Sequence, residues 1–315
     1  MQCPICEYPK AHLRYQMSDR FFQVCSDEFM LYECNSCGLV FQDENMIKDR
    51  LEEFYPPGYW WQSYGKVSGL ERVFREWVVR HDQLRFLNSL CPDQRGRLLD
   101  IGCGSATFVK LALQDGFNAY GLDQSAEAAR IAERNVPGRI FQRLKGDLIE
   151  PGERFDILTL FHCLEHIVDP FSYIKNIRKL LRRPGKLIVQ VPNVRSLQAR
   201  LFGYRWYGLD CPRHVYNYSP FSLLHLLGRT GFRIQRVRYF SLRDNAAALI
   251  SSLCPSLDPV SQRVKLLKRK HKLYSSSLFL KETLYFILFV LAQPPSFVEA
   301  VLGRGATVTV YATIE

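Results

Sequence analysis

The chain has 315 residues, enough to bury one large hydrophobic core and to carry smaller attached elements. Apolar residues make up 47% of it and no low-complexity tract interrupts them, which excludes an intrinsically disordered chain. The formal net charge of +11 suits nucleic acid or an anionic membrane, yet the basic residues are widely spread except for RVKLLKRKHK at 263–272. We find neither a signal peptide nor an apolar run of bilayer length, the longest being LYFILFVLA before Pro294 and Pro295, and therefore expect a cytoplasmic protein.

Two C-x-x-C pairs stand at the front of the chain, Cys3 with Cys6 and Cys34 with Cys37. In a cytoplasmic chain this spacing favours a metal site over disulfides, because each pair lets a tight turn aim two thiolates at one point. The pattern predicts a zinc-ribbon module over residues 1–44 with a closed, structural site of four sulfurs. The alternative is four reduced cysteines without a metal.

Residues 45–95 are expected to form a connector. The segment EEFYPPGYWWQSYG is aromatic and rich in Pro and Gly, and near-helical apolar spacing from Leu70 to Leu87 predicts an amphipathic helix after it. Tyr55 and Tyr59 in the aromatic segment have two interpretations. They pack in the core, or they form part of a lid over an acceptor site.

From Arg97 onward, short apolar strands alternate with helices. Strands are predicted at 97–101, 118–123, 139–144, 155–161, 186–192, 232–240 and 306–314. Helices are predicted at 107–115, 126–134, 170–181, with Asp169 as N-cap, and 219–227. The alternation predicts an α/β fold at 96–315 with a doubly wound, mostly parallel sheet, whose ligand lies beyond the carboxyl ends of the strands.

The turn after the first of these strands is DIGCGSATF, residues 100–108. It is not a dinucleotide fingerprint, because Thr107 stands where G-x-G-x-x-G needs its third glycine. It fits D-x-G-x-G-x-[G/A] instead, and Asp100 places a negative charge that favours a cationic ligand over a pyrophosphate. Asp123, at the end of the second strand, suits a ribose diol, and Asp147 after the third suits an adenine amino group. A sulfonium-charged adenosine satisfies all three.

Six segments, taken in order, resemble the class I S-adenosylmethionine-dependent methyltransferases, and most closely their ubiquinone-pathway O-methyltransferases: LLDIGCGSATF, YGLDQS, GDL, FDILTLFHCLEHIVDP, RRPGKLIVQVPN and DCPRHVYNYSPFSLLHLLGRTGF. The four-cysteine front also resembles zinc-bearing sugar C-methyltransferases. The resemblance implies a Rossmann-like sheet of seven strands, the last one antiparallel, with 241–304 as an insertion before it. It implies S-adenosylmethionine as cofactor, held by the residues Asp100, Gly102, Cys103 and Gly104 at the methionine end, Asp123 and Gln124 at the ribose, Asp147 and Leu148 at the adenine, and Phe161 and His162 beside them.

Candidate catalytic groups lie in HCLEH and CPRH, after the fourth and fifth strands. One interpretation has Glu165 and His166 holding the loop by hydrogen bonds. A second makes His166 or His214 a general base. A third is a divalent-metal site of His162, Glu165, His166 and His214, which resembles the E-x-x-E-H set of related O-methyltransferases. Because His162 replaces a Glu there, it would favour a softer ion than magnesium.

The acceptor is expected to be a small molecule with a hydroxyl or an activated carbon, such as a sugar, a glycan precursor, or a phenolic or lipid-like compound. No D/N-P-P-Y run, typical of enzymes that methylate base amines, is present. Trp206 and Tyr207, as stacking surfaces, and Arg213 are further candidates for the acceptor wall, and plain packing explains the two aromatic residues equally well. Basic and apolar residues at 263–295 favour either an extra helical hairpin or contact with the inner membrane face. The rival functions are an RNA methyltransferase and a non-catalytic scaffold that binds the cofactor.

Overall fold

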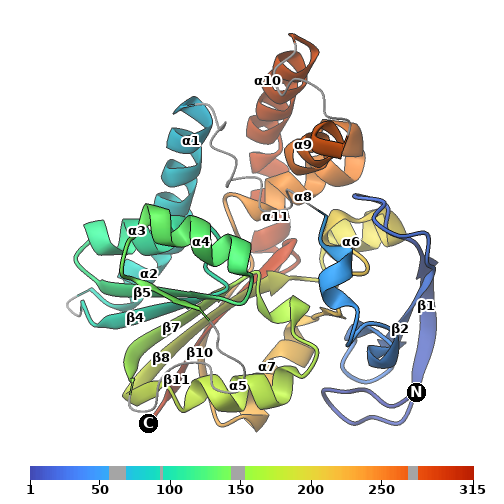
Figure 1. Ribbon diagram of the computed structural model, residues 1–315. Helices are drawn as coiled ribbons and strands as arrows, with labels where there is room; N and C mark the ends of the chain where they lie inside the picture. Colours follow the sequence, from blue (N-terminus) through green and yellow to red (C-terminus); the bar gives the residue numbers. More distant parts are fainter. Residues whose placement is uncertain (57–68, 93–94, 143–152, 269–275) are drawn as a thin grey trace.

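The computed structural model describes residues 1–56, 69–92, 95–142, 153–268 and 276–315, and a seven-stranded sheet forms its centre (Figure 1). The strand order is β10-β11-β8-β7-β4-β5-β6. The bounds are β4 Arg97–Ile101, β5 Asn118–Asp123, β6 Ile140–Gln142, β7 Phe155–Phe161, β8 Leu181–Pro192, β10 Arg233–Arg238 and β11 Thr307–Ile314. Strands β4 to β8 pair in parallel, and β11 is antiparallel to β8 and β10. The predicted doubly wound sheet with an antiparallel last strand is confirmed.

Helices cover both faces of this sheet, which explains why β4 and β7 are apolar along nearly their whole length. Helices α3 (Thr107–Gln114) and α4 (Ala126–Asn135) lie on one face, and α5 (Pro170–Arg178) and α7 (Pro220–Arg229) on the other (Figure 1). Side-chain caps fix their starts, since Asp169 accepts from Ser172 N and Ser219 forms a capping box with Ser222. Helix α5 ends three residues earlier than predicted, because Leu181 already pairs with Phe155 as part of β8.

A second, smaller sheet holds the N-terminal cysteines. Its order is β1-β2-β3-β9, with β1 Ala11–Met17, β2 Phe29–Cys34, β3 Val40–Gln42 and β9 Tyr216–Asn217. Strand β9 comes from the catalytic part of the chain and pairs antiparallel with β3, Val40 opposite Asn217. The N-terminal sheet therefore includes a strand that lies between the predicted site residue His214 and helix α7.

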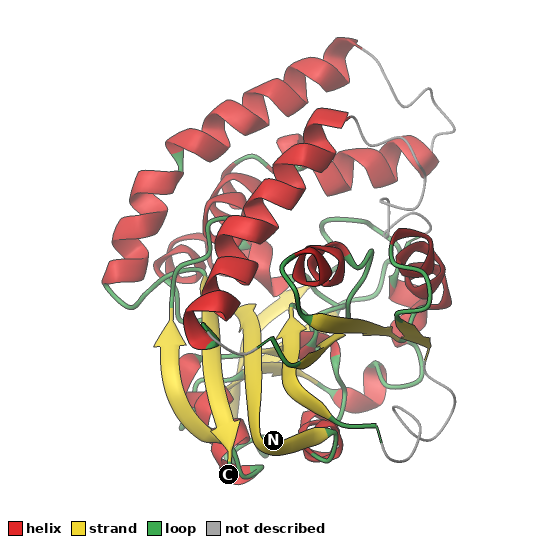
Figure 2. Ribbon diagram, turned by 90° about the vertical axis from the view of Figure 1, so that its left-hand side faces the viewer, coloured by secondary structure: helices red, strands yellow, loops and turns green. Residues whose placement is uncertain are grey.

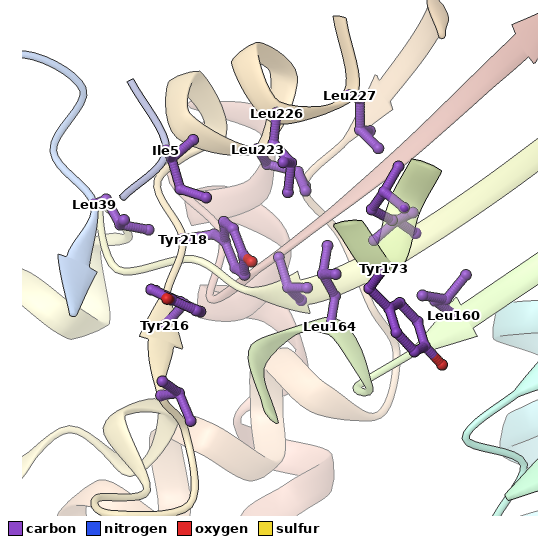
Figure 3. Packing of buried hydrophobic residues seen from close by; sticks show 14 of the residues in the cluster. Ile5, Leu39, Leu160, Leu164, Tyr173, Tyr216, Tyr218, Leu223, Leu226 and Leu227 are labelled. Atoms are coloured by element: carbon purple, nitrogen blue, oxygen red, sulfur yellow. The ribbon is translucent and has the colours of Figure 1, made fainter. Parts of the chain in front are cut away.

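The hydrophobic core is also shared between the two parts. Ile5 and Leu39 of the N-terminal segment belong to the same buried cluster as Leu164 and Leu223. Figure 3 shows Ile5 and Leu39 lying close to Tyr218 and Leu223. The domain boundary after residue 44 stays a prediction, and apolar packing continues across it.

Helices fill the connector and the insertion before β11. The connector forms α1 (Gly69–Val79), one π-helical turn (Arg80–Leu84) and α2 (Arg85–Leu90). The insertion forms α8 (Asp244–Leu253), α9 (Pro259–Lys268), α10 (Ser276–Leu291) and α11 (Gln293–Val301), and α6 (Leu197–Phe202) lies beside them. Seen from the side, helices gather above one end of the sheet (Figure 2).

One helical segment of the described chain, Phe279–Val301, is long and apolar enough to cross a bilayer by length and composition, and 28% of it is buried. The expectation that no such segment exists was wrong. Helix α10 ends at Leu291, and helical structure resumes at once in α11, because Pro294 and Pro295 occupy its first turn, where proline needs no hydrogen-bond partner for its nitrogen.

Candidate active site

The glycine turn after β4 is built by residues that leave the ordinary right-handed backbone region. Gly102, Gly104 and Ala106 have φ of 76°, 53° and 58°, and only glycine adopts such values without strain. A Cβ on Gly102 would lie 2.8 Å from Cys163 Sγ, so the turn touches the HCLEH loop. The structure therefore brings the predicted cofactor turn and the predicted catalytic loop into contact.

Two buried carboxylates organise this turn. Asp123 accepts from Gly104 N at 2.8 Å and from Ser125 N at 2.9 Å, and Asp100 accepts from Thr159 Oγ1 at 2.7 Å. Burial raises the pKa of Asp100 to about 7, the bond from Thr159 opposes the rise, and the charge of Asp123 adds to it. A pair of buried carboxylates without a positive partner among the described side chains fits a cationic ligand.

The other predicted cofactor residues surround the turn where the structure describes them. Cys103 is buried beside Gly121, Gln124 is exposed just after β5, and Phe161 packs its ring edge-on against Phe108 with centroids 5.0 Å apart. Asp147 and Leu148 lie outside the described residues.

The HCLEH loop turns only briefly as a helix, a 3-10 turn over Leu164–His166. His162 precedes it with φ of 54°, a conformation that non-glycine residues adopt mainly where function requires it. Its N–H donates to Gln190 O at 2.9 Å, which fixes the loop to β8.

Glu165, His166 and His214 come together, and one ligand atom from each lies within 4.8 Å of the other two. Both histidines have Nδ1 beside a backbone carbonyl, His166 at 3.0 Å from Arg213 O and His214 at 2.8 Å from Gly208 O. Because a carbonyl oxygen only accepts, Nδ1 carries the proton in each neutral ring, and Nε2 keeps its lone pair. Histidines that ligate a metal commonly donate their other ring N–H to a carbonyl oxygen in this way.

The carboxylate in this cluster is fully buried. Both oxygens of Glu165 lack a hydrogen-bond partner among the described residues, although His162 Nδ1 lies 3.3 Å from Oε1. Burial alone would raise the pKa of Glu165, but the surrounding histidines lower it below its ordinary value. Burial and His214 lower the pKa of His166 to about 4, so its ring is neutral at pH 7. A buried anionic carboxylate with one ring nitrogen from each of two histidines within 4.8 Å fits a divalent cation of the zinc or manganese type.

His162 is not part of this cluster, contrary to the four-residue metal set. Its Nε2 lies 2.9 Å from Asp244 Oδ2, at the start of α8, and Gln190 and Ser241 bond the same oxygen. Burial would lower the pKa of His162, but Asp244 and Glu165 raise it to about 9. His162 is therefore a cation held between two carboxylates. Asp244 was not predicted as a site residue, because no sequence motif marks it.

Two residues predicted for the acceptor wall lie in the protein interior instead. Arg213 is completely buried, and its guanidinium donates to Asp19, Asp210 and the carbonyl of Phe54. Trp206 is 1% exposed and packs against the Gly208 backbone, whose carbonyl accepts from His214. Both therefore support the loop that carries His214, and neither presents a surface to an acceptor.

Tyr55 does reach the cluster. Its hydroxyl lies 3.0 Å from His166 Nδ1, and its side chain is only partly buried. Tyr59 lies outside the described residues.

The four cysteines form a second cluster, with all four sulfur atoms within 4.8 Å of one another. Cys3 Sγ lies 3.6 Å from Cys37 Sγ, and Cys6 Sγ lies 3.6 Å from Cys34 Sγ. Backbone N–H groups of Ser36 and Cys37 point at Cys34 Sγ. A tetrahedral zinc ion with Zn–S bonds of about 2.3 Å spaces its sulfurs by about 3.8 Å, so the cluster fits zinc.

The sheet order, the acidic glycine turn and the buried polar cluster at the carboxyl edge together define a class I methyltransferase. A family described as "Methyltransferase domain" matches residues 70–237, more than half of the chain. The chain belongs to this family and is an S-adenosylmethionine-dependent methyltransferase, as the sequence predicted.

Curated relatives agree with this assignment. The chain is 27% identical over 182 residues to the ubiquinone biosynthesis O-methyltransferase of Cereibacter sphaeroides, covering 51% of this chain and 71% of that protein. It is 25% identical over 195 residues to the protein of the same name from Coxiella burnetii, covering 58% and 79%.

Among solved structures, a SAM dependent methyltransferase from Archaeoglobus fulgidus aligns with a TM-score of 0.48 and 18% identity, covering 78% of this chain and 97% of that one. Magnesium protoporphyrin IX methyltransferase from Synechocystis, with bound SAH, aligns with a TM-score of 0.48 and 15% identity, covering 87% and 100%.

Proposed function

We propose that the enzyme transfers a methyl group from S-adenosylmethionine to a hydroxyl or an activated carbon of a small molecule, of the sugar, glycan-precursor, phenolic or lipid-like kind. The observation that carries this proposal is the buried cluster of Glu165, His166 and His214 next to the glycine turn. The named relatives are O-methyltransferases, which favours an oxygen acceptor.

The cofactor would lie along the carboxyl ends of β4 and β5. Asp100, Gly102 and Gly104 are proposed to hold its methionine end, and Asp123 its ribose. Oδ2 of Asp123 accepts from Gly104 N and Oδ1 accepts from Ser125 N, and the carboxylate has further lone pairs that could accept from a ribose hydroxyl.

The acceptor would be positioned in line with the methyl group and lose its proton near the histidines. His166, with its pKa lowered to about 4, is a weak base at neutral pH, and its neutral Nε2 is better suited to a ligand role. We propose that Glu165, His166 and His214 hold a divalent cation. When bound, such an ion would lower the pKa of an acceptor hydroxyl. Tyr55, at His166, is proposed to border the acceptor.

The test is methyl transfer from labelled S-adenosylmethionine to a panel of catechols, nucleotide sugars, lipid-linked sugars and short RNAs. Turnover of a small-molecule hydroxyl or carbon is expected, and Glu165→Gln should slow it by about 10²–10⁴-fold. Methylation of RNA alone would overturn the acceptor class. Cofactor binding without turnover on any acceptor would favour a scaffold. Full activity after chelation that spares the four-cysteine zinc would contradict the proposed divalent cation at Glu165, His166 and His214.

Cofactor affinity is expected to depend on pH through Asp100. Its folded-state pKa of about 7 lies above the ordinary 3.8, so the neutral form stabilises the fold at low pH, and this contribution is lost as pH rises toward 7. The ammonium group of S-adenosylhomocysteine needs the ionised form. Its Kd should therefore be about tenfold weaker at pH 6 than at pH 8 by calorimetry. Asp100→Asn should flatten this dependence, and a flat wild-type profile would contradict the assignment of Asp100.

We also propose one structural zinc ion per chain at Cys3, Cys6, Cys34 and Cys37. Elemental analysis of purified protein should find it, and Cys37→Ser should lose it together with thermal stability, because the site ties the turn before β1 to the turn after β2. Cys25→Ser is the matched control, since Cys25 lies in the same segment outside the cluster. A folded wild-type chain without metal would refute the proposal.

A further inference from the structure

We propose that the outer face of α10 and α11 docks onto the surface of a bilayer that contains anionic lipid. Large apolar side chains are exposed at every turn from Phe279 to Leu302, among them Leu284, Ile287, Leu291 and Val298. We call this row the apolar stripe. Several members are more than half exposed, Phe279 at 67% and Val301 at 70%.

The apolar stripe carries no exposed charge after Glu282, and Lys281 and Glu282 near its start are partly buried. Between Thr283 and Leu302 the sequence has one charged residue, Glu299, and its side chain is buried against Gln198 on the inner side, with an Oε1–Nε2 distance of 2.7 Å. Soluble monomers rarely expose continuous apolar patches larger than a few hundred Å², and larger ones mark contact with a partner or a membrane. An exposed apolar helical face of this length therefore indicates contact with a partner or a membrane.

The opposite side of these helices is firmly packed. Phe289 and Ala292 are buried with Ala246 and Ile250 of α8, and Phe74 of α1 stacks edge-on against Phe289 with centroids 5.6 Å apart. This packing holds the stripe as a fixed face of the folded protein. It also argues for lying on a bilayer surface rather than crossing it, because a spanning helix would have to abandon α1 and α8.

The positive charge of the chain favours an anionic membrane surface as the binding partner of the apolar stripe. Six basic residues, Arg263, Lys265, Lys268, Arg269, Lys270 and Lys272, precede α10 directly in the sequence, and the whole chain carries +11. A second copy would bring the same charge and be repelled, whereas acidic headgroups attract such segments by about 1 kcal/mol per Lys or Arg near the surface. Apolar residues entering the headgroup boundary beside basic ones are typical of interfacial helices.

The position of the stripe relative to the catalytic cluster fits this role. Helix α8 begins at Asp244, which holds His162, and Ala246 and Ile250 of the same helix pack against Phe289 of α10. One helix thus separates the bilayer face from the active site. The docking itself does not depend on which acceptor is methylated.

The test is cosedimentation of the full chain with phosphatidylcholine vesicles, with and without phosphatidylglycerol, at low and high salt. Wild type should bind the anionic vesicles at low salt and release them as salt rises. Phe279→Glu combined with Leu291→Glu should weaken binding by at least about tenfold, since two charges would enter the apolar boundary. The matched control is Phe221→Glu with Leu201→Glu, which adds the same charge at side chains 60% and 75% exposed, on α7 and α6. All variants are compared by thermal melting.

Four results would overturn the proposal. Wild type could stay in solution at low salt. The two double variants could lose binding equally, which would indicate charge alone. Light scattering could show that wild type forms a dimer that only the α10 variant dissolves, which would assign the stripe to a second copy. Membrane association that survives high salt and alkaline wash would instead indicate a spanning helix and also refute surface docking.

Discussion

The Arg213→Met variant is expected to lose about 3–5 kcal/mol of unfolding free energy, because removing one partner of a buried ion pair leaves its counter-charges unpaired. The loss would be a large part of the stability of an ordinary domain. Arg213 is fully buried, and its guanidinium pairs with Asp19 at 2.9 Å and Asp210 at 2.7 Å. Methionine fills a similar volume, so the measured loss would report mainly the two abandoned carboxylates.

The matched control is Arg233→Met. Arg233 also pairs with a carboxylate, that of Glu315 at 2.9 Å, but the two side chains are 73% and 84% exposed. Exposed pairs contribute about 0–1 kcal/mol, so this variant should unfold in urea almost as wild type does. Equal losses of unfolding free energy in the two variants would mean that burial does not determine how much the Arg213 ion pairs contribute to stability.

The Asp123→Ala variant is expected to bind S-adenosylhomocysteine about 100-fold more weakly or worse. It removes the acceptor proposed for the ribose hydroxyls, and it also leaves Gly104 N and Ser125 N without their partner. Hydrogen bonds to a charged group contribute about 1.5–3 kcal/mol each. Losing the ribose contact together with the shape of the turn is therefore sufficient to weaken binding by about 100-fold. Calorimetric titration measures the affinity.

Asp43→Ala serves as the control for this variant. The carboxylate of Asp43 accepts from Asn45 N at 3.0 Å, two residues along the chain, as that of Asp123 accepts from Ser125 N. Both variants therefore lose the same local turn, and only Asp123 lies at the proposed cofactor site. A similar fall in affinity for both would show that the effect is indirect and would remove Asp123 from the site.

The sheet could be predicted from the sequence because its signals are local. Strands such as β5, β7 and β8 contain short apolar runs, and α5 and α7 begin at side-chain caps, Asp169 and Ser219, although β10 is mostly polar and α3 and α8 have no side-chain cap. The meeting of Glu165, His166 and His214 follows from topology, since all three come after the carboxyl ends of neighbouring strands β7 and β8.

The other features of the site depend on contacts between residues that lie far apart in the sequence. Local sequence patterns do not predict such contacts. Asp244 lies 82 residues after His162, and only the fold of the insertion brings them together. Arg213 was expected at the acceptor because it follows the fifth strand at the carboxyl edge of the sheet, but it is buried in an ion pair with Asp19, which lies 194 residues away. Strand β9 has two residues, too few for a periodic signal.

Strand β9 has a consequence for any attempt to treat the cysteine segment as a removable unit. A chain truncated before Asp43 would leave Tyr216 and Asn217 without the strand that pairs with them, and would uncover Tyr218 and Leu223. Transplanting the segment onto another methyltransferase would fail for the same reason, because the recipient must supply the fourth strand. The cysteine segment can therefore be transferred to another protein only together with the part of the chain that supplies β9.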